Sequence, residues 1–419
     1  MYFSFKEKTL KSLYNILTCI ASFHLKIIAL FNAKLNLGVK GRAKTFNILK
    51  STISIKDNVI WFHCASLGEY EQGHPVFEKI KSHYSKHKIV LSFFSPSGYE
   101  IKKDTSIADT VVYLPLDTPQ NAKTFLNLVH PNLVVFVKYE FWPNYLNELK
   151  NKKIKSILIS ALFRKDQSFF KFYGKWMRSS LNAFDHIFVQ NMISKKLLNS
   201  INYTNVSVSG DTRFDRVSNQ LQTDNTLDFI EQFKQDNLCV VAGSTWPEDE
   251  QFFINFINTS PKNLKFIIAP HNIKKQQIIA LKKAIKREAV LFSEKNNITI
   301  IDAQVFIIDT IGILSKIYNY AEIAYVGGAM GSKGLHNTLE AAVFGVPIII
   351  GKNYSNFPEA SEMIARKGMY TISKQSEFNS TLNNLINNKQ KRLDSGLANA
   401  NYIAINKGAV GKITHYLFS

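Results

Sequence analysis

Two glutamates each follow directly on an apolar run of strand length. Glu69 comes after the run 59–62 and a turn of small residues, and Glu140 ends the run that begins at Leu133. Ligands of parallel α/β sheets bind outside the carboxyl ends of the strands, so both carboxylates are predicted at one rim. Such a pair can divide the work of proton transfer, because one group can act as base while the other holds a proton or stabilises positive charge.

Each glutamate also has an ordinary structural interpretation. Glu69 would lie in the first turn of a helix, where a negative charge complements the helix dipole. Glu140 could form an ion pair with Lys138 or with another base. On these segments alone, the catalytic and the structural interpretations are equally good.

A glycine-rich turn is the strongest candidate for phosphate binding in the second half of the chain. An apolar strand enters the segment 327–334, and the sequence predicts a helix from about Leu335. Such a turn can present backbone N–H groups to a phosphate, but its spacing fits neither G-x-G-x-x-G nor the P-loop. Asn337 and Glu340 lie one helical turn apart. Glu340 could bind ribose hydroxyls, although a solvated glutamate is the better interpretation without further context.

Two cationic side chains are further candidates for ligand binding. Arg213 lies near the predicted domain boundary, where a guanidinium suits a carboxylate or a phosphate. Most arginines are surface charges, so this signal is weak by itself. His271 follows Pro270 at the end of an apolar run, where a ring nitrogen or a backbone amide could reach a nucleotide.

The scaffold that must position these residues is a set of parallel strands. Apolar runs of strand length alternate with helical patterns, which is the rhythm of βαβ units. The polar stretch between Asp211 and Asp236 interrupts it. We therefore expect an α/β protein with two Rossmann-like domains facing a cleft. The predicted strands are 59–66, 89–95, 111–116, 133–140, 156–160 and 186–190, and then 239–244, 266–270, 298–302, 305–309, 323–327 and 346–351.

Composition limits the class of protein. A chain of 419 residues with 45% hydrophobic content can bury two cores. Its three cysteines are odd in number and widely spaced, which argues against a disulfide framework and for a reducing compartment. The formal net charge of +20 implies a polyanionic partner, either nucleic acid, an anionic membrane or a phosphorylated substrate. No nucleic-acid-binding module is visible, so we expect no nucleic acid partner.

The N-terminal region favours the membrane among these partners. Between Leu10 and Phe31 a wide apolar stripe at helical spacing faces away from polar residues. Lys26 would cost about 2.5–3.5 kcal/mol at the centre of a transmembrane span, and no signal-peptide cleavage site follows. We therefore expect an interfacial helix on an anionic leaflet. The alternative is a helix whose apolar stripe packs on the protein's own core.

Eight segments taken together resemble the 3-deoxy-D-manno-octulosonic acid (Kdo) transferases of lipopolysaccharide synthesis, in family order over nearly the whole chain. The resemblance implies a glycosyltransferase B fold with a membrane-associated helix and linker at 1–40, an acceptor-binding domain at 41–215 and a CMP-Kdo-binding domain at 216–419. The segments are WFHCASLGEYEQG (61–73), SFFSPSGYE (92–100), YLPLDTP (113–119), KYEFWPNYL (138–146), VSGDTRFD (208–215), VAGSTWPEDE (241–250), IIAPHN (267–272) and GGAMGSKGLHNTLEAAVFGVPIIIG (327–351).

The resemblance also implies an inverting transfer of Kdo from CMP-Kdo to a lipid A precursor, lipid IVA, at the cytoplasmic face of the inner membrane. It implies no metal and no other cofactor. Glu69 matches the general base, and Glu140 and Arg213 match positions that stabilise the transition state. The residues that match the CMP-binding segments are Pro270, His271, Ile311, Gly312, Ile313, Asn337, Thr338, Leu339 and Glu340, and those that match the acceptor site are Ser66, Gly68 and Ser97.

Three positions depart from the family pattern. Members often have arginine where His271 stands, glutamate where Ile313 stands and lysine where Arg213 stands. Loss of the arginine removes a permanent cation from the expected nucleotide site. Another nucleotide-sugar enzyme of the same fold, such as an epimerase, is the alternative, but it would need no lipid-facing helix. Neither the number of Kdo units transferred nor the oligomeric state follows from the sequence.

Overall fold

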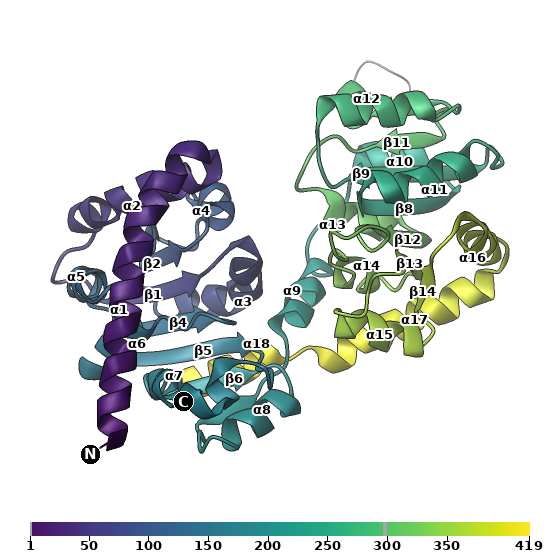
Figure 1. Cartoon of the computed structure of the whole chain (residues 1–419). Helices are drawn as coiled ribbons and strands as arrows, with labels where there is room; N and C mark the ends of the chain where they lie inside the picture. Colours follow the sequence, from purple (N-terminus) through teal and green to yellow (C-terminus); the bar gives the residue numbers. More distant parts are fainter. Residues whose placement is uncertain (1, 296–299) are drawn as a thin grey trace. The chain divides into compact units, whose positions relative to one another are not determined.

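The computed structural model describes residues 2–295 and 300–419 and divides the chain into two compact units (Figure 1). The first unit holds the chain up to Arg216 together with Gly408–Ser419, and the second holds Val217–Lys407. Each unit is built on one seven-stranded sheet whose paired strands are parallel. This confirms the predicted α/β fold with two Rossmann-like sheets.

The sheet of the first unit has the strand order β3-β2-β1-β4-β5-β6-β7. Six of its strands lie within or next to the predicted runs. The seventh has only three residues, too few to give a pattern in the sequence. The strands are β1 Val59–Cys64, β2 Lys88–Phe93, β3 Thr110–Tyr113, β4 Leu133–Val137, β5 Lys155–Ala161, β6 His186–Val189 and β7 Val206–Val208.

Helices cover both faces of this sheet. Three of them, α4, α5 and α6, begin with proline, whose fixed φ suits a first helical turn and whose missing N–H is not needed there. The helices are α2 Ala33–Thr52, α3 Leu67–His83, α4 Pro96–Lys102, α5 Pro119–Val129, α6 Pro143–Asn151, α7 Lys175–Leu181, α8 Met192–Asn199 and α9 Thr212–Gln220, with short 3-10 turns η2 Ser168–Phe170 and η3 Phe172–Gly174.

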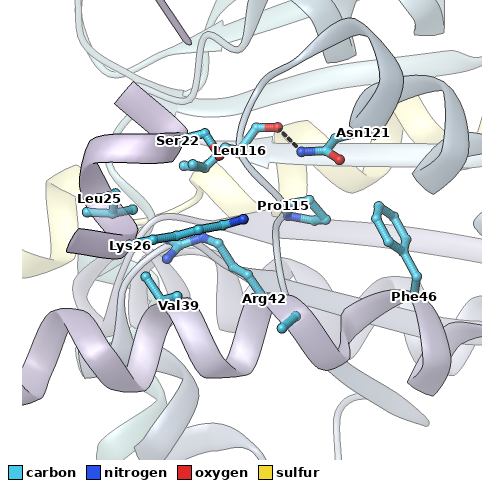
Figure 2. Close-up of a pocket in the computed structure, with 10 residues that line it drawn as sticks. Ser22, Leu25, Lys26, Val39, Arg42, Phe46, Pro115, Leu116 and Asn121 are labelled. Carbon is cyan, nitrogen blue, oxygen red and sulfur yellow. Dashed lines mark hydrogen bonds between the residues drawn. The ribbon is translucent and has the colours of Figure 1, made fainter. Parts of the chain in front are cut away.

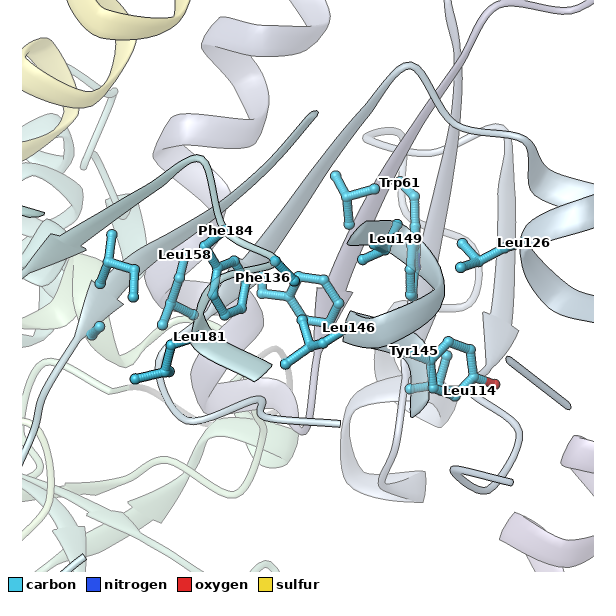
Figure 3. Close-up of a cluster of buried hydrophobic side chains, with 14 of the residues drawn as sticks. Trp61, Leu114, Leu126, Phe136, Tyr145, Leu146, Leu149, Leu158, Leu181 and Phe184 are labelled. Carbon is cyan, nitrogen blue, oxygen red and sulfur yellow. The ribbon is translucent and has the colours of Figure 1, made fainter. Parts of the chain in front are cut away.

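The first sheet separates two hydrophobic cores, because successive strand residues face opposite sides. Trp61 of β1 belongs to one core, where its ring lies 5.3 Å from Phe136 and 5.9 Å from Tyr145 (Figure 3). The next residue, Phe62, belongs to the other core and stacks on Phe77 of α3 at 4.1 Å. Because its side chains alternate between the two faces, β1 contributes residues to both cores.

The C-terminal helix α18 (Ala409–Phe418) corrects the predicted domain division, which assigned 216–419 to the second domain. Its apolar residues Val410, Ile413 and Leu417 belong to a core of the first sheet. The Asp215 carboxylate accepts hydrogen bonds at the start of this helix, from the N–H groups of Gly408 at 2.9 Å and Ala409 at 3.0 Å. Burial of one apolar helical stripe thus returns the chain end to the first unit.

The second unit has the strand order β10-β11-β9-β8-β12-β13-β14. The predicted run 298–302 lies partly outside the described residues, and its described part, 300–302, is not a strand. The short edge strands β10 and β14 are not predicted. The strands are β8 Leu238–Thr245, β9 Leu264–Pro270, β10 Ala289–Leu291, β11 Val305–Ile307, β12 Ile323–Val326, β13 Ile348–Gly351 and β14 Met369–Ile372.

Helices of the second unit fill the intervals between these strands. They include two four-residue helices that follow loops at the carboxyl ends of strands. The helices are α10 Asp228–Lys234, α11 Pro247–Ile257, α12 Lys275–Ala284, α13 Leu314–Ile317, α14 Leu339–Ala342, α15 Pro358–Ala365, α16 Gln375–Asn387 and α17 Lys389–Asn406, with 3-10 turns η4 Phe292–Glu294 and η5 Tyr318–Tyr320.

The N-terminal helix α1 (Tyr2–Ile28), followed by the 3-10 turn η1 (Ala29–Phe31), lies along the first unit (Figure 1). Its polar side contacts the unit, since the Tyr14 hydroxyl donates to Asp117 at 2.8 Å and the Asn144 amide donates to Asn15 at 2.9 Å. The apolar stripe is exposed. Its members are Leu10, Leu13, Ile16, Leu17, Ile20, Phe23, Ile27, Ile28 and Phe31.

This orientation contradicts the alternative in which the stripe packs on the protein's own core. The segment Thr9–Phe31 is also long and apolar enough to cross a membrane by length and composition. Burying the polar side and exposing the apolar side is unfavourable in water, but it suits a helix that meets a lipid surface.

Candidate active site

Glu69 lies in the first turn of α3, as predicted, at the third helical position. Ser66 is the N-cap residue of this helix, and its hydroxyl donates to the Glu69 carboxylate. Glu69 is half-buried, and the neighbouring Gly68 is exposed. The cap therefore holds the carboxylate in one orientation while solvent, or a ligand, can still reach it.

The first turn of α4 lies against the loop before α3. A Cβ atom placed on Gly98 would lie 2.3 Å from the Phe93 ring and 3.0 Å from the Ser66 carbonyl carbon, so a larger residue does not fit at this position. Ser97 lies beside Gly98, and its hydroxyl is 3.0 Å from that of Ser95, the N-cap residue of α4. The structure thus brings together the predicted acceptor-site residues Ser66, Gly68 and Ser97.

Glu140 follows β4 and is only 7% exposed. Its Oε2 atom accepts a hydrogen bond from Trp142 Nε1 at 2.7 Å and lies 2.9 Å from His63 Nε2. Among the described residues the basic partner of Glu140 is His63 and not Lys138, whose ammonium lies 5.3 Å from the centre of the Tyr139 ring. Lys138 has a left-handed backbone with φ of 71°, which is uncommon for a residue other than glycine.

A chain of hydrogen bonds through His63 fixes the Glu140 carboxylate. His63 is fully buried in β1, and its Nδ1 atom lies 2.8 Å from the Ser92 hydroxyl. That hydroxyl accepts a hydrogen bond from Trp61 Nε1 at 2.7 Å, so its own proton can be donated to His63 Nδ1. The Glu140 carboxylate can only accept, so His63 donates the Nε2 proton to it. Each polar group in this buried chain has a partner.

Cys64 shows that the two glutamates lie at the same place in the fold. Burial raises the pKa of the Cys64 thiol, and the negative charges of Glu69 and Glu140 raise it further. Cys64 is the last residue of β1, so both carboxylates flank the carboxyl end of that strand. The predicted common rim is therefore present in the structure.

Arg213 is held on the same side of the fold as α3. Its Nε and a terminal nitrogen lie 2.8 Å and 2.7 Å from Asp211 Oδ2. Asp211 Oδ1 accepts a hydrogen bond from the side chain of Gln72, one helical turn after Glu69, at 2.9 Å. The guanidinium is thus oriented by a fork-like pair with Asp211, and about one third of its side-chain surface stays exposed.

Three rings form a stack at the carboxyl ends of strands in the second unit. The His271 ring lies 4.2 Å from His336 and 4.9 Å from Trp246. Trp246 Nε1 donates a hydrogen bond to His336 Nε2 at 2.9 Å. Burial and the neighbouring His271 lower the pKa of His336 to about 4, and burial lowers the pKa of His271 as well. Both imidazoles are therefore neutral at pH 7.

The glycine-rich loop is fixed by a buried aspartate that the sequence analysis does not predict. Asp249 Oδ2 accepts hydrogen bonds from the N–H groups of Gly328 and Trp246, both at 2.9 Å, and Oδ1 accepts one from Tyr325 at 2.7 Å. Gly328 has φ of 97°, and a Cβ atom there would lie 2.2 Å from the carbonyl oxygen of Gly334. Only glycine fits this close approach of backbone to backbone.

The helix predicted from about Leu335 begins later, because residues up to Thr338 belong to the loop and α14 starts at Leu339. Asn337 and Glu340 do contact each other, as the Asn337 amide donates to Glu340 at 3.0 Å. Among the described residues, the Thr338 hydroxyl is buried without a hydrogen-bond partner. A buried hydroxyl of this kind is a natural binding group for a ligand.

The remaining predicted segment is an open turn before α13, since Ile311 is 82% exposed and Gly312 has φ of 92°. Tyr318 follows at the end of α13. The charge of Glu340 contributes to raising the pKa of this buried phenol, which shows that Glu340 lies near the end of α13.

Comparison with known proteins identifies the class of enzyme. Residues 39–216 match the family described as 3-deoxy-D-manno-octulosonic-acid transferase (Kdo transferase). The chain is 27% identical to the Kdo transferase of Haemophilus influenzae, over 85% of this chain and 86% of that protein. It is 26% identical to the Kdo transferase of Aquifex aeolicus, over 82% and 90%. The chain is a glycosyltransferase.

Solved structures support the fold of this glycosyltransferase. The UDP-GlcNAc 2-epimerase of Neisseria meningitidis has a TM-score of 0.61 at 15% identity, over 86% of this chain and 99% of that one. A putative UDP-N-acetylglucosamine 2-epimerase from Listeria monocytogenes has a TM-score of 0.57 at 12% identity, over 86% and 95%. At these identities the likeness concerns the glycosyltransferase B type of fold alone.

Several residues that organise the site of the transferase could not be predicted from the sequence. Two of them, His63 and Ser92, lie inside apolar strands and resemble ordinary core residues, and the other four stand in loops or at helix starts. The sequence offers one signal for these groups. His63 is a histidine inside an apolar run, in the same segment 61–73 that carries Glu69. The groups are His63, Ser92, Trp142, Asp211, Trp246 and Asp249.

Proposed function

We propose that this glycosyltransferase transfers Kdo from CMP-Kdo to a lipid A precursor, lipid IVA, with inversion at the anomeric carbon and release of CMP. The observation that carries the proposal is the carboxylate pair Glu69 and Glu140 at the end of β1, inside the Kdo transferase domain. The name of the matching relatives supports Kdo as the sugar. The exposed apolar stripe of α1 and the net charge of +20 support an anionic lipid acceptor.

In the proposed step, Glu69 accepts the proton of the acceptor hydroxyl while the hydroxyl oxygen forms a bond to the anomeric carbon of Kdo. The bond from that carbon to the phosphate oxygen of CMP breaks in the same displacement, and the phosphate keeps the electron pair. Ser66 orients the base through its hydrogen bond. Ser66, Gly68 and Ser97 are proposed to line the place of the acceptor.

Glu140 and Arg213 are proposed to stabilise charge in the transition state. Glu140 is fixed by Trp142 and His63 and needs little reorganisation when positive charge develops on the sugar. Arg213, oriented by Asp211, is proposed to meet the carboxylate of Kdo or the phosphate of CMP.

The second unit is proposed to bind CMP-Kdo at the carboxyl ends of its strands. Asn337 and Glu340 offer an amide and a carboxylate to the ribose hydroxyls, and the buried Thr338 hydroxyl offers a further partner. The proposed site also includes the loop 311–313, Leu339 and the segment from Pro270 to His271.

A neutral His271 leaves the CMP phosphate without the cation that family members often carry there. Lys333 lies in the glycine-rich loop, with its ammonium 5.8 Å from the centre of the Trp246 ring. That ring belongs to the same stack as His271. We propose that Lys333 supplies the missing positive charge.

The proposed location is the cytoplasmic face of the inner membrane, with α1 lying on the leaflet. Tyr14 donates a hydrogen bond to the first unit and Asn15 accepts one from it, and a spanning helix would have to break both. We also propose that the reaction needs no bound metal, since cations and backbone dipoles can stabilise the leaving phosphate. Full activity in EDTA would support this, and loss that magnesium restores would contradict it.

The deciding experiment incubates the full chain with CMP-Kdo and lipid IVA in neutral detergent. We expect CMP release together with a lipid product whose mass increases by whole Kdo units. An epimerase would convert a nucleotide sugar such as UDP-GlcNAc without any lipid. Absence of a Kdo-bearing lipid under conditions where the protein is folded would refute the proposal.

A further inference from the structure

A cavity of about 260 Å³ lies between the two N-terminal helices and the first sheet (Figure 2). The reaction step proposed above does not use it. It is bounded by α1, by α2 and by the chain that follows β3. Its lining residues are Ser22, Leu25, Lys26, Val39, Arg42, Ala43, Phe46, Pro115, Leu116 and Asn121.

Two cations line this cavity, and none of its ten lining residues is acidic. Lys26 reaches in from α1 and Arg42 from α2 (Figure 2). The acid nearest in sequence to the lining, Asp117, is already engaged by the Tyr14 hydroxyl and by backbone N–H groups at the start of α6. Two positive charges at one cavity repel each other, and an anion between them would remove that repulsion.

Arg42 is held in place without using all of its donors. Its guanidinium donates to the backbone carbonyls of Leu114, at 3.1 Å, and Phe94, and lies over the Phe94 ring at 4.5 Å. A guanidinium carries five N–H groups, so several are left for a ligand. No hydrogen bond or ion pair engages the Lys26 ammonium among the side chains described for residues 9–295 and 300–419. The cavity thus offers the Arg42 guanidinium in a fixed orientation together with the flexible Lys26 ammonium.

Two aromatic rings connect Arg42, which lines the cavity, to the carboxylate site. The Phe94 ring that lies under Arg42 also packs on the Trp142 ring at 4.8 Å. Trp142 in turn donates its indole N–H to Glu140 at 2.7 Å. Arg42 and Glu140 are therefore separated by two packed rings, a spacing that one amphiphilic sugar molecule can bridge.

One side of the cavity belongs to the lipid-facing helix α1. Lys26 is exposed at the border of the apolar stripe, next to Phe23 and Ile27. Apolar groups such as Leu25 and Phe46 make up much of the remaining wall. Cationic groups set in an apolar wall beside a membrane surface suit the anionic head of an amphiphile rather than a free ion in water.

We propose that this cavity binds a phosphate group of the lipid acceptor. This inference rests on the proposed function, because the acceptor is taken to be a phosphorylated lipid. Lys26 and Arg42 hold the phosphate oxygens, and the sugar that bears the phosphate continues along the Phe94 and Trp142 rings toward Glu140. Binding of the phosphate in the cavity therefore sets the distance from Arg42 at which the reacting hydroxyl lies.

The test measures the equilibrium dissociation constant of lipid IVA for the full chain in neutral detergent, without donor and without turnover. Lys26→Gln should weaken binding about tenfold, which is the loss expected for one charge-assisted contact. Lys11→Gln, an equal charge change on the exposed part of α1, should leave it unchanged. Ala43→Phe fills the cavity from an exposed backbone position and should weaken binding without altering either cation.

A matched ligand identifies what the cavity holds. Two acceptors are compared, each lacking a different phosphate of lipid IVA. The acceptor that lacks the phosphate held by the cavity should bind to Lys26→Gln and to the unaltered protein with equal affinity. Equal affinities of Lys26→Gln and Lys11→Gln for lipid IVA would overturn the inference. An equal loss of affinity for phosphatidylglycerol in the same detergent would also overturn it, because the occupant would then be bulk phospholipid. Since no Kdo transfer is measured, failure of the proposed function would appear separately, as binding without CMP release.

Discussion

His63 Nε2 lies 2.9 Å from Glu140 Oε2, and both side chains are buried. The carboxylate also accepts the indole N–H of Trp142, so two donors from different segments fix one oxygen. His63 does not extend to the exposed rim, which makes it a positioning residue rather than a group that touches substrate. This pair explains how a carboxylate after an apolar strand can stay in one orientation.

Trp142→Phe should lower kcat about tenfold and leave both KM values nearly unchanged. The substitution keeps the ring that packs on Phe94 but removes one hydrogen bond to a charged group, whose loss costs roughly 1.5–3 kcal/mol. Steady-state kinetics with both substrates check this. Phe141→Leu, which changes the adjacent aromatic residue, is the control. A Trp142→Phe enzyme with unaltered kcat would remove Trp142 from the support of Glu140.

Glu69→Gln should lower kcat by a factor of about 10² to 10⁴, because a carboxamide cannot accept the proton of the acceptor hydroxyl. The half-buried position and the hydrogen bond from Ser66 allow the fold to persist, which circular dichroism and thermal unfolding can verify. Glu78→Gln removes a carboxylate from the exposed side of the same helix and should retain activity. Equal activity of the two variants would exclude Glu69 as base.

Lys333→Gln should raise KM for CMP-Kdo about tenfold with little change in kcat. The neutral His271 cannot hold the phosphate charge, so the proposed donor site depends on this ammonium. Lys389→Gln, an exposed change on α17, serves as the matched control. The assignment of Lys333 fails when the two variants show the same KM for the donor.

Lowering the pH from about 6.5 to about 4 should destabilise the second unit through His336. Burial and the nearby His271 depress the pKa of His336 in the folded state to about 4, so the unfolded chain binds the proton more tightly. Stability is therefore complete above the unfolded pKa of about 6.5 and is lost as the pH falls toward about 4. Protonation of His336 Nε2 also breaks the hydrogen bond that this atom accepts from Trp246 Nε1.

Thermal unfolding of His336→Gln between pH 4 and pH 7 checks this linkage. A glutamine oxygen can accept from Trp246 without titrating, so the variant should depend less steeply on pH than the unaltered chain. The same pH dependence in both proteins would show that His336 does not contribute.

Replacing Ile20 and Phe23 together by serine should reduce partitioning onto anionic vesicles by roughly tenfold or more. Both side chains are exposed on the stripe of α1, and each loses the free energy of burying an apolar side chain in lipid. Sedimentation with vesicles measures the change. Leu397→Ser alters a similarly exposed residue of α17 in the second unit and should have no effect. Unchanged partitioning of the double variant would contradict the interfacial role of α1.

Much of the fold can be predicted because parallel strands buried on both faces are continuous apolar runs. The runs that became β1, β4 and β8 are examples. Strands of three residues, such as β7 and β10, cannot be predicted in this way because they contain too few apolar residues to form a recognisable run. The C-terminal helix escapes it for another reason: an apolar stripe shows that α18 packs on something, but not on which sheet.

The candidate site divides in the same way. By itself the sequence determined that Glu69 and Glu140 stand after apolar strands, that a glycine-rich turn lies in the second half, and that α1 carries an apolar stripe. Those features follow from order and spacing along the chain. Only the tertiary structure decided that His63 and Trp142 hold Glu140, that Asp249 fixes the glycine-rich loop, and that α1 turns its polar side inward. These relations join residues distant in sequence, and the periodicity of a segment carries no information about the partner that it meets.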